Sequence, residues 1–252
     1  MTAFLALWNR IASPALQREY ETWHAFEHVP ERVGLPGFRE ARRYRSWDVD
    51  ADGVPLYFTW YGLDHLDTLG TPQYRDVFAQ PTPWSARMRT QLRAFDRQPC
   101  TLAGAWGTSV AGQLCTLQLR GGAQAWPVLE HALAALVHDA QLVSAQWGRV
   151  QESPAFVVPI ANSANSANSA NRSEAVPGID AVLLLQGLDR ATLAASAAQL
   201  VAALAAVAHT VRPPEFFELQ TQVRQADLAH PLTARQPALM PLFHSFATGD
   251  TP

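Results

Sequence analysis

Residues 23–44 read WHAFEHVPERVGLPGFREARRY, and this stretch carries most of the sequence signal for the fold. Apolar residues recur with a period near 3.6 before it and within its first part, which predicts a helix over 16–33. Pro30 should kink or end that helix, and Gly37 should complete a turn by taking a positive φ. The aromatic and basic residues that follow predict a strand over 39–47.

Outward from this stretch, the same order of strands and helices occurs twice along the chain. Each pass runs strand, helix, two strands, helix, strand, which is the ferredoxin-like arrangement of a four-stranded antiparallel sheet with two helices on one face. In the first pass we expect strands at 4–8, 39–47, 54–62 and 99–106, and helical segments at 16–33, 64–78 and 84–92. In the second pass we expect strands at 113–120, 141–150, 179–186 and 215–223, and helices at 123–139 and 189–209.

Short matches between the two passes indicate an internal duplication. The pattern WxxxEH at 23–28 recurs at 126–131, and a Gly-Leu-Asp triplet recurs at 62–64 and 187–189. A sheet with helices on one face needs cover on the other face, and a second copy supplies it by packing sheet to sheet. We therefore expect an α+β chain of two tandem ferredoxin-like βαββαβ units, which together form a fused pseudo-dimer.

The expected division of the chain follows from this pattern. Residues 1–110 form the first unit, residues 111–228 form a second, degenerate unit, and residues 229–252 form a C-terminal tail that wraps the outside. The repeat ANSANSANSAN at 161–171 consists of small and polar residues that cannot build a core. We expect a disordered loop near 160–173.

The composition excludes several classes of function. The chain has 252 residues, 48% hydrophobic and 16% charged, with a formal net charge of −3, which argues against nucleic acid as a partner. All 19 basic residues are arginine, which excludes a Schiff-base lysine and a P-loop lysine. Cys100 and Cys115 are too few for a disulfide scaffold and suit a reducing compartment. Without a recognisable signal peptide or membrane-spanning run, we expect a cytoplasmic protein with no membrane partner.

The first predicted helix carries a carboxylate on its apolar face. On a helical wheel, Glu27 falls within the apolar stripe, and His24 and His28 lie at its edge. A buried carboxylate is costly unless it is paired or protonated, so Glu27 needs a partner, for which Arg42 and Arg43 are available. Two interpretations stay open: Glu27 is a structural anchor, or it moves a proton together with His28.

The segments WHAFEHVPERVGLPGF (23–38) and ARRY (41–44) resemble the EthD-like branch of the dimeric α/β-barrel superfamily. The resemblance implies that the two units close into an intrachain α/β barrel, with a ligand cleft between the sheet and the helices of the first unit. Superfamily members include cofactor-free monooxygenases, polyketide cyclases, lactone isomerases, dehydratases and haem-binding enzymes. The resemblance also implies functional roles for four residues, namely Glu27, His28, Arg43 and Tyr44.

These residues predict a small-molecule enzyme that uses no organic cofactor and no metal. His28 would act as general base or acid, Glu27 would orient it or shuttle the proton, and Arg43 or Tyr44 would stabilise negative charge on the substrate. The expected reaction is that of a lyase, dehydratase or isomerase on a ring-bearing or oxygenated metabolite. The residues expected to line the substrate cleft are His24, Trp23, Trp60, Tyr57 and Trp84.

Several alternatives remain at this stage. The chain could be a non-catalytic module that binds a ligand or a partner protein, or a cofactor-free monooxygenase. Residues 24–28 match the H-x-x-E-H zinc motif, but no third ligand is marked by its context, and no histidine stands out as a haem ligand. Arg32 is expected at the surface. A pseudo-dimer already covers its sheets, so we expect a monomer, with a homodimer as the alternative.

Overall fold

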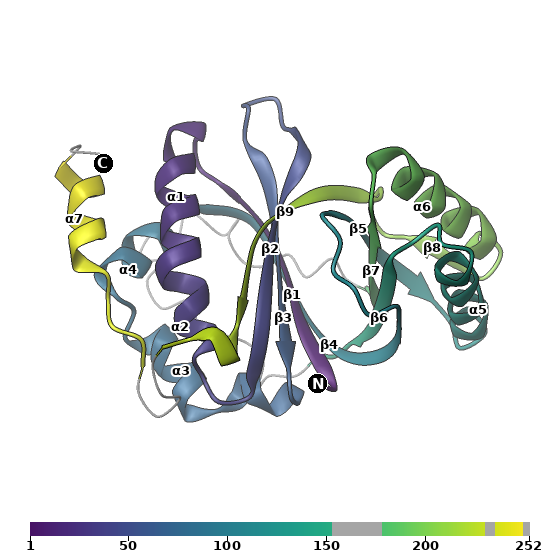
Figure 1. The fold of residues 1–252 in the computed structure, drawn as a ribbon, viewed down its shortest axis with the longest axis horizontal. Coiled ribbons are helices and arrows are strands. Elements are labelled where there is room, and N and C mark those ends of the chain that lie inside the picture. Colours follow the sequence, from purple (N-terminus) through teal and green to yellow (C-terminus); the bar gives the residue numbers. More distant parts are fainter. Residues whose placement is uncertain (153–177, 230–234, 249–252) are drawn as a thin grey trace.

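The computed structural model describes residues 1–152, 178–229 and 235–248. The repeat loop expected near 160–173 lies outside these residues. Eight strands close into an antiparallel barrel in the order β5-β7-β6-β4-β1-β3-β2-β9, and β9 pairs with the first part of β5 to complete it (Figure 1). The short β8 pairs with the last residues of β5. The strands are β1 (Ala3–Ile11), β2 (Phe38–Val49), β3 (Pro55–Leu63), β4 (Leu92–Trp106), β5 (Gln113–Gly121), β6 (Ser144–Val150), β7 (Ala181–Gly187), β8 (Ala208–Thr210) and β9 (Glu215–Arg224).

Helices cover the barrel on two opposite sides (Figure 1). One side carries α1 (Gln17–Trp23), α2 (Val29–Val33), α3 (Pro72–Ala79), α4 (Pro83–Arg89) and α7 (Met240–Thr248), and the other carries α5 (Ala125–His138) and α6 (Arg190–Leu204). Short 3-10 turns lie at Pro14–Leu16, Leu66–Gly70 and Gln225–Asp227. No helix in the described ranges has both the length and the apolar character needed to cross a bilayer.

The two halves of the barrel have the same strand order. The first half runs β4-β1-β3-β2 and the second runs β9-β5-β7-β6, so that β2 meets β9 at one seam and β4 meets β6 at the other. Hydrogen-bonded edges therefore join the halves, in addition to the packing of their inner faces. The predicted α+β class with an antiparallel barrel is confirmed.

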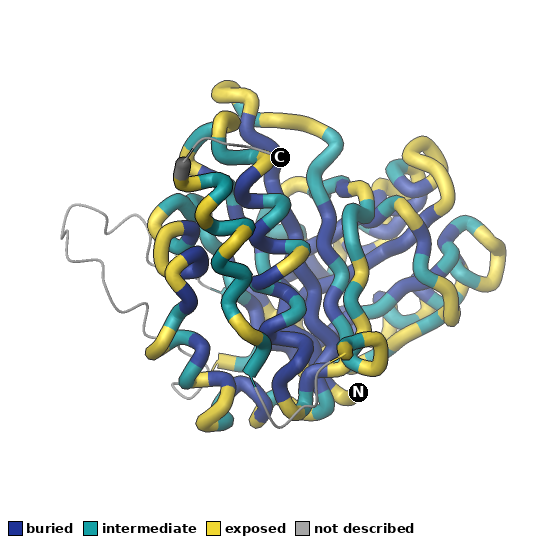
Figure 2. Tube along the Cα trace, turned by 60° about the vertical axis from the view of Figure 1, so that its left-hand side comes forward, coloured by how far each residue is buried: buried dark blue, intermediate teal, exposed yellow. Residues whose placement is uncertain are grey.

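Aromatic and aliphatic side chains fill the barrel. Trp8, Tyr44, Phe58 and Trp60 from the first half meet side chains of the second half in one buried cluster. Figure 2 shows the barrel strands as the buried centre, with the exposed residues on turns and outer helix faces. Burying one such side chain stabilises the fold by about 1.5–3 kcal/mol, so this core, to which both halves contribute, stabilises their association.

The first helix of the chain is not a continuous α-helix. Between α1 and α2 lies a π-helical turn, His24–His28, in which the Val29 amide donates to the His24 carbonyl five residues earlier. Proline has no N–H, so Pro30 cannot bond the carbonyl four residues before it, and the widened turn accommodates this break. The predicted helix over 16–33 is therefore present, and the predicted break at Pro30 takes the form of a π turn.

Two other expectations needed correction. The predicted helix over 64–78 is divided into a 3-10 turn and α3, because Pro72 can start a helix but cannot continue one through its missing N–H. The C-terminal tail was expected only to wrap the outside, yet it contains α7, which packs on the helices of the first half. Proline chemistry accounts for the first difference, and tertiary contacts with the first half account for the second.

Candidate functional site

A buried arginine lies at the centre of the helix-covered face of the first half. Arg43 on β2 is 2% exposed, and its guanidinium carbon lies 4.8 Å from the centre of the Tyr20 ring and 4.6 Å from that of Tyr57. Cation–π contacts with two rings offset part of the cost of burying this charge. Within the described ranges no carboxylate forms an ion pair with Arg43. A buried cation without a counter-ion is unusual and calls for a functional explanation.

Polar atoms without a hydrogen-bond partner gather around Arg43. The described part of the chain has further buried atoms of this kind elsewhere, and those near Arg43 are Nδ1 of His24 and His28, Nη2 of Arg32, Nε and Nη2 of Arg43, Oγ1 of Thr59 and the hydroxyl of Tyr61. Arg43 pairs directly with Thr59 across the β2–β3 ladder, and Tyr61 lies two residues further on the same face. We call these six residues the polar cluster. Native proteins leave few buried polar groups unpaired, so a concentration in one place indicates a site that holds something else.

The two histidines are brought together by the π turn. Their rings stack at a centroid distance of 5.0 Å, and the Trp23 ring lies 4.3 Å from that of His28. Burial lowers the pKa of both imidazoles well below the usual value, and the positive charge of Arg32 and Arg43 lowers it further. Both rings are therefore neutral at pH 7, which is the state that a proton acceptor needs.

The same environment shifts the pKa of other groups in the polar cluster and beside it. Burial raises the pKa of the Tyr61 phenol, so this hydroxyl stays protonated and can donate a hydrogen bond. Burial and the neighbouring Arg32 lower the pKa of Arg89 to about 10. The pKa of His28 is shifted by Arg32, Arg89 and Arg43 in the same direction. The potential at the imidazoles is thus positive, which favours a ligand with negative charge.

Arg32 belongs to an ion network and is not at the surface, contrary to expectation. It is 3% exposed, and its Nη1 contacts Oε2 of Glu31, which is 1% exposed. Oε1 of Glu31 accepts a hydrogen bond of 2.6 Å from Nε of Arg235 in the C-terminal segment. The guanidinium carbon of Arg32 also lies 5.5 Å from the centre of the Phe78 ring on α3, and the sequence pattern around Arg32 indicated neither this contact nor the one between Arg235 and Glu31.

Glu27 has partners other than the arginines expected from the sequence. Its Oε1 accepts a 2.6 Å hydrogen bond from the Thr82 hydroxyl, and its Oε2 accepts one of 2.7 Å from the Leu239 amide. Thr82 also caps α4, and Leu239 precedes α7. Glu27 thus ties the π turn to two other elements, which is the arrangement of a structural anchor.

The structure brings some predicted site residues together and separates others. His24, His28, Trp23, Tyr57 and Arg43 lie on the helix-covered face. Tyr44 and Trp60 point to the opposite face, into the barrel, because successive strand residues alternate between faces.

Trp84 lies beyond the polar cluster, on α4. Its Nε1 donates to Glu19 at 3.1 Å, and its ring packs against Phe243 and Phe246 of the tail. Trp84 thus joins α1, α4 and α7.

Sequence reasoning missed Thr59, Tyr61 and Arg235 as members of this region. Alternation along β3 puts Tyr61 on the same face as Tyr57, with Thr59 between them, but it does not tell that this face meets the helices. Nothing in the sequence near Arg235 indicates that it reaches Glu31.

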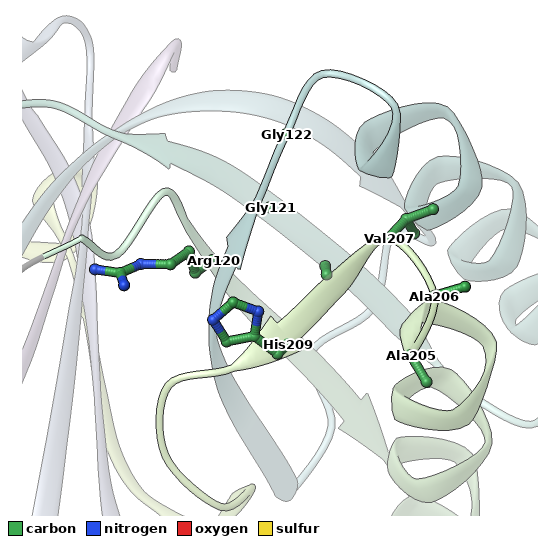
Figure 3. A pocket seen from close by; sticks show the side chains of 8 residues that line it. Arg120, Gly121, Gly122, Ala205, Ala206, Val207 and His209 are labelled. Atoms are coloured by element: carbon green, nitrogen blue, oxygen red, sulfur yellow. The ribbon is translucent and has the colours of Figure 1, made fainter.

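The second half contains a shallow hollow of about 360 Å³ (Figure 3). Two of its polar groups are already engaged: Nε of Arg120 donates to the Gly178 carbonyl at 2.8 Å, and the Gly121 amide donates to Asp180 at 2.9 Å. Figure 3 shows the Arg120 side chain directed away from the segment Ala205–Val207 that forms the far wall. This hollow offers less chemistry than the polar cluster. The described residues contain no group of three His, Cys, Asp or Glu side chains placed to hold a metal ion.

Comparison with solved structures defines the class of fold. An anthrone oxidase-like protein is similar with a TM-score of 0.59 and 10% identity, over 90% of this chain and 95% of that one. A candidate monooxygenase from Fusobacterium nucleatum matches with a TM-score of 0.56 and 7% identity, over 91% and 98%. A candidate chlorite dismutase matches with a TM-score of 0.52 and 12% identity, over 88% and 96%.

The chain therefore has the fold of the dimeric α/β barrels, as the sequence resemblance implied. At these identities the likeness concerns the fold alone. No protein-family model matches the chain, and no curated protein matches it by sequence. Assignment to the EthD-like branch stays a prediction.

Proposed function

We propose that the protein is a small-molecule enzyme that removes a proton from a ring-bearing substrate at the polar cluster. The observation that carries this proposal is the concentration of unpaired buried polar atoms around Arg43. A substrate oxygen would supply the acceptor that the arginine lacks, and a neutral imidazole would accept the proton.

The chemistry can be assigned to named groups. His28 takes a proton from a carbon next to a ring carbonyl, and the electron pair moves onto the carbonyl oxygen. Arg43 and the Tyr61 hydroxyl stabilise the resulting oxyanion by hydrogen bonds. Trp23, Tyr20 and Tyr57 provide flat apolar surfaces for the ring. Tyr44 takes no part in this mechanism because it faces the barrel interior, and Glu27 anchors the turn that holds His28.

Several reactions share this first step. Protonation of the anion at another carbon gives an isomerase, loss of a leaving group gives a lyase or dehydratase, and reaction with oxygen gives a cofactor-free monooxygenase. The non-catalytic alternative would bind the ring without exchanging its proton.

Deuterium exchange tests the shared step without knowledge of the product. The probe is anthrone, an enolisable ring ketone, incubated with the protein in D2O and followed by NMR, beside a panel of cyclic ketones and phenols. We expect incorporation by the wild-type protein, loss of incorporation in His28→Gln, and no loss in His131→Gln, the exposed counterpart in the second half. Exchange by no compound of the panel would contradict the proposal, and an oxygen electrode separates oxygenation from the other outcomes.

We also propose that the chain is a tandem pair of ferredoxin-like units, 1–110 and 111–228, related by duplication. The identical strand order of the two halves supports this. If it is correct, residues 1–110 alone expose the edges of β2 and β4 and should self-associate through them, which gel filtration would detect. A monomeric or unfolded fragment would contradict the division.

A further inference from the structure

The C-terminal segment contributes a charge beside the polar cluster. Arg235 lies just before α7, far from the first helices in sequence, yet its guanidinium reaches the buried carboxylate of Glu31. Its Nη1 also donates to the Gln80 carbonyl at 2.6 Å and lies 3.5 Å from Asp76. Contacts with Glu31, Gln80 and Asp76 hold the guanidinium of Arg235 in one position, so that it stays hydrogen-bonded to Glu31.

The two oxygens of Glu31 are divided between two arginines. Oε1 accepts from Arg235, and Oε2 contacts Nη1 of Arg32. An arginine and a carboxylate prefer a two-point contact in which the guanidinium engages both oxygens. Arg32 cannot form that contact here, because Arg235 occupies one of them. Its Nη2 is left buried and without a hydrogen-bond partner.

The charge of Arg32 shifts the pKa of other residues in the polar cluster. Among charged groups, Arg32 has the largest effect on the pKa of both His28 and Tyr61. The other groups that lower the pKa of His28 are His24, Arg89 and Arg43, and Glu27 lies on the same turn with both oxygens hydrogen-bonded. Arg32 therefore supplies much of the positive potential in which the imidazole works.

We propose that Arg235 is a positioning residue for the site: by holding one oxygen of Glu31, it keeps the second Nη of Arg32 directed to the substrate anion. This inference rests on the proposed function, which places the substrate at the polar cluster. Without Arg235, Arg32 would turn onto both oxygens of Glu31, and its charge would be neutralised away from the imidazole.

The test compares Arg235→Gln with Arg224→Gln. Arg224 pairs with Asp227 on the exposed end of β9 and is a matched control. The first measurement is the pKa of His28 by NMR, with its signal assigned from the spectrum of His28→Gln. In Arg235→Gln we expect the pKa of His28 to rise by about 0.5. The guanidinium of Arg32 then turns away from the imidazole, and one arginine instead of two neutralises the carboxylate of Glu31. The pKa of His28 should not change in Arg224→Gln.

A second variant has the opposite expected sign. In Glu31→Gln the carboxylate is lost and the charge of Arg32 is no longer neutralised, so the pKa of His28 should fall below that of the wild type. An unchanged pKa of His28 in folded Arg235→Gln, or a rise in Glu31→Gln, would overturn the proposal. Thermal melting identifies a variant that fails to fold, and the other variant then decides.

Binding of benzoate, an aromatic monoanion, gives the second measurement. Trp23 lies against His28, so its fluorescence reports occupation of the site. Loss of one charge-assisted hydrogen bond should weaken benzoate binding about tenfold in Arg235→Gln. Equal affinity in this variant and the wild type would count against the role of Arg235. Failure of benzoate to bind the wild type would instead count against an anion site, and the pKa of His28 would still decide the role of Arg235.

Discussion

The Arg43 guanidinium lies 4.6 Å from the centre of the Tyr57 ring, and no described carboxylate forms an ion pair with it. The protein thus holds a cation in its interior beside two aromatic rings, without a carboxylate paired to it among the described residues. Such an arrangement lowers the stability of the unliganded protein and raises its affinity for an anion. Binding and catalytic sites often combine these two effects.

Replacement of Arg43 by methionine tests this balance. Two cation–π contacts are worth about 2 kcal/mol or more each when desolvated, and they offset only part of the several kcal/mol that an unpaired buried charge costs. We therefore expect the free energy of unfolding of Arg43→Met, measured in urea, to rise by about 1 kcal/mol. Benzoate binding should be lost at the same time.

The control for this variant is Arg45→Met. Arg45 lies on the same strand and pairs with Glu21 at 3.7 Å near the surface. Its replacement should change stability little and leave benzoate binding intact. A large loss of stability in Arg43→Met would show that the arginine is structural.

The two histidines predict how stability depends on pH. Their pKa values are lowered in the folded state, so the unfolded chain binds more protons once the pH falls below the ordinary histidine value. The free energy of unfolding should accordingly decrease as the pH falls from 7 toward 5. In a His24→Gln, His28→Gln double variant this decrease should be smaller, as urea unfolding at each pH would measure.

Glu215 provides a control of the opposite sign. Burial raises its pKa to about 6, so it takes up a proton in the folded state before it does so in the unfolded chain. Its contribution favours folding as the pH falls through 6, and Glu215→Gln should make the acid-side loss of stability steeper. A slope that is the same in all variants would contradict both assignments.

Replacement of Glu27 by glutamine separates its two interpretations. The carboxylate accepts hydrogen bonds from Thr82 and from the Leu239 amide, and an amide group would present a donor to one of them. We expect a loss of about 2 kcal/mol in stability and benzoate binding close to that of the wild type. Glu130→Gln, at the corresponding half-buried position on α5, should leave stability unchanged. A stable Glu27→Gln protein that no longer exchanges the anthrone protons would instead place Glu27 in the chemistry.

The Leu-Pro-Gly turn makes a prediction about folding. Gly37 has φ +87°, and a Cβ added there would overlap the Thr68 hydroxyl. Gly37→Ala should destabilise the protein by more than about 2 kcal/mol, from backbone strain and the overlap together. Gly53 has φ +77° with no atom within 4 Å of an added Cβ, so Gly53→Ala should lose only about 1 kcal/mol. Thermal melting compares the two, and equal losses would remove the role of Thr68.

Part of the candidate site was predictable. The helix period placed His24 and His28 at the edge of the buried stripe, and the family resemblance pointed to Arg43 on the following strand. The faces of β2 and β3 were not predictable, since alternation tells which residues share a face and not which face meets the helices. For this reason Tyr44 and Trp60 were grouped with His28, although they lie inside the barrel.

By itself, the sequence determined the order of the eight barrel strands, the turn at Gly37 and the break at Pro30, because backbone conformation and side-chain period are local properties. Only the tertiary structure decided which polar groups have partners. The partners of Glu27 and Glu31 come from Leu239 and Arg235, about two hundred residues away along the chain. Contacts between such distant segments depend on packing of the whole chain, and among the described residues they leave Arg43 without an ion pair and Nη2 of Arg32 without a hydrogen-bond partner.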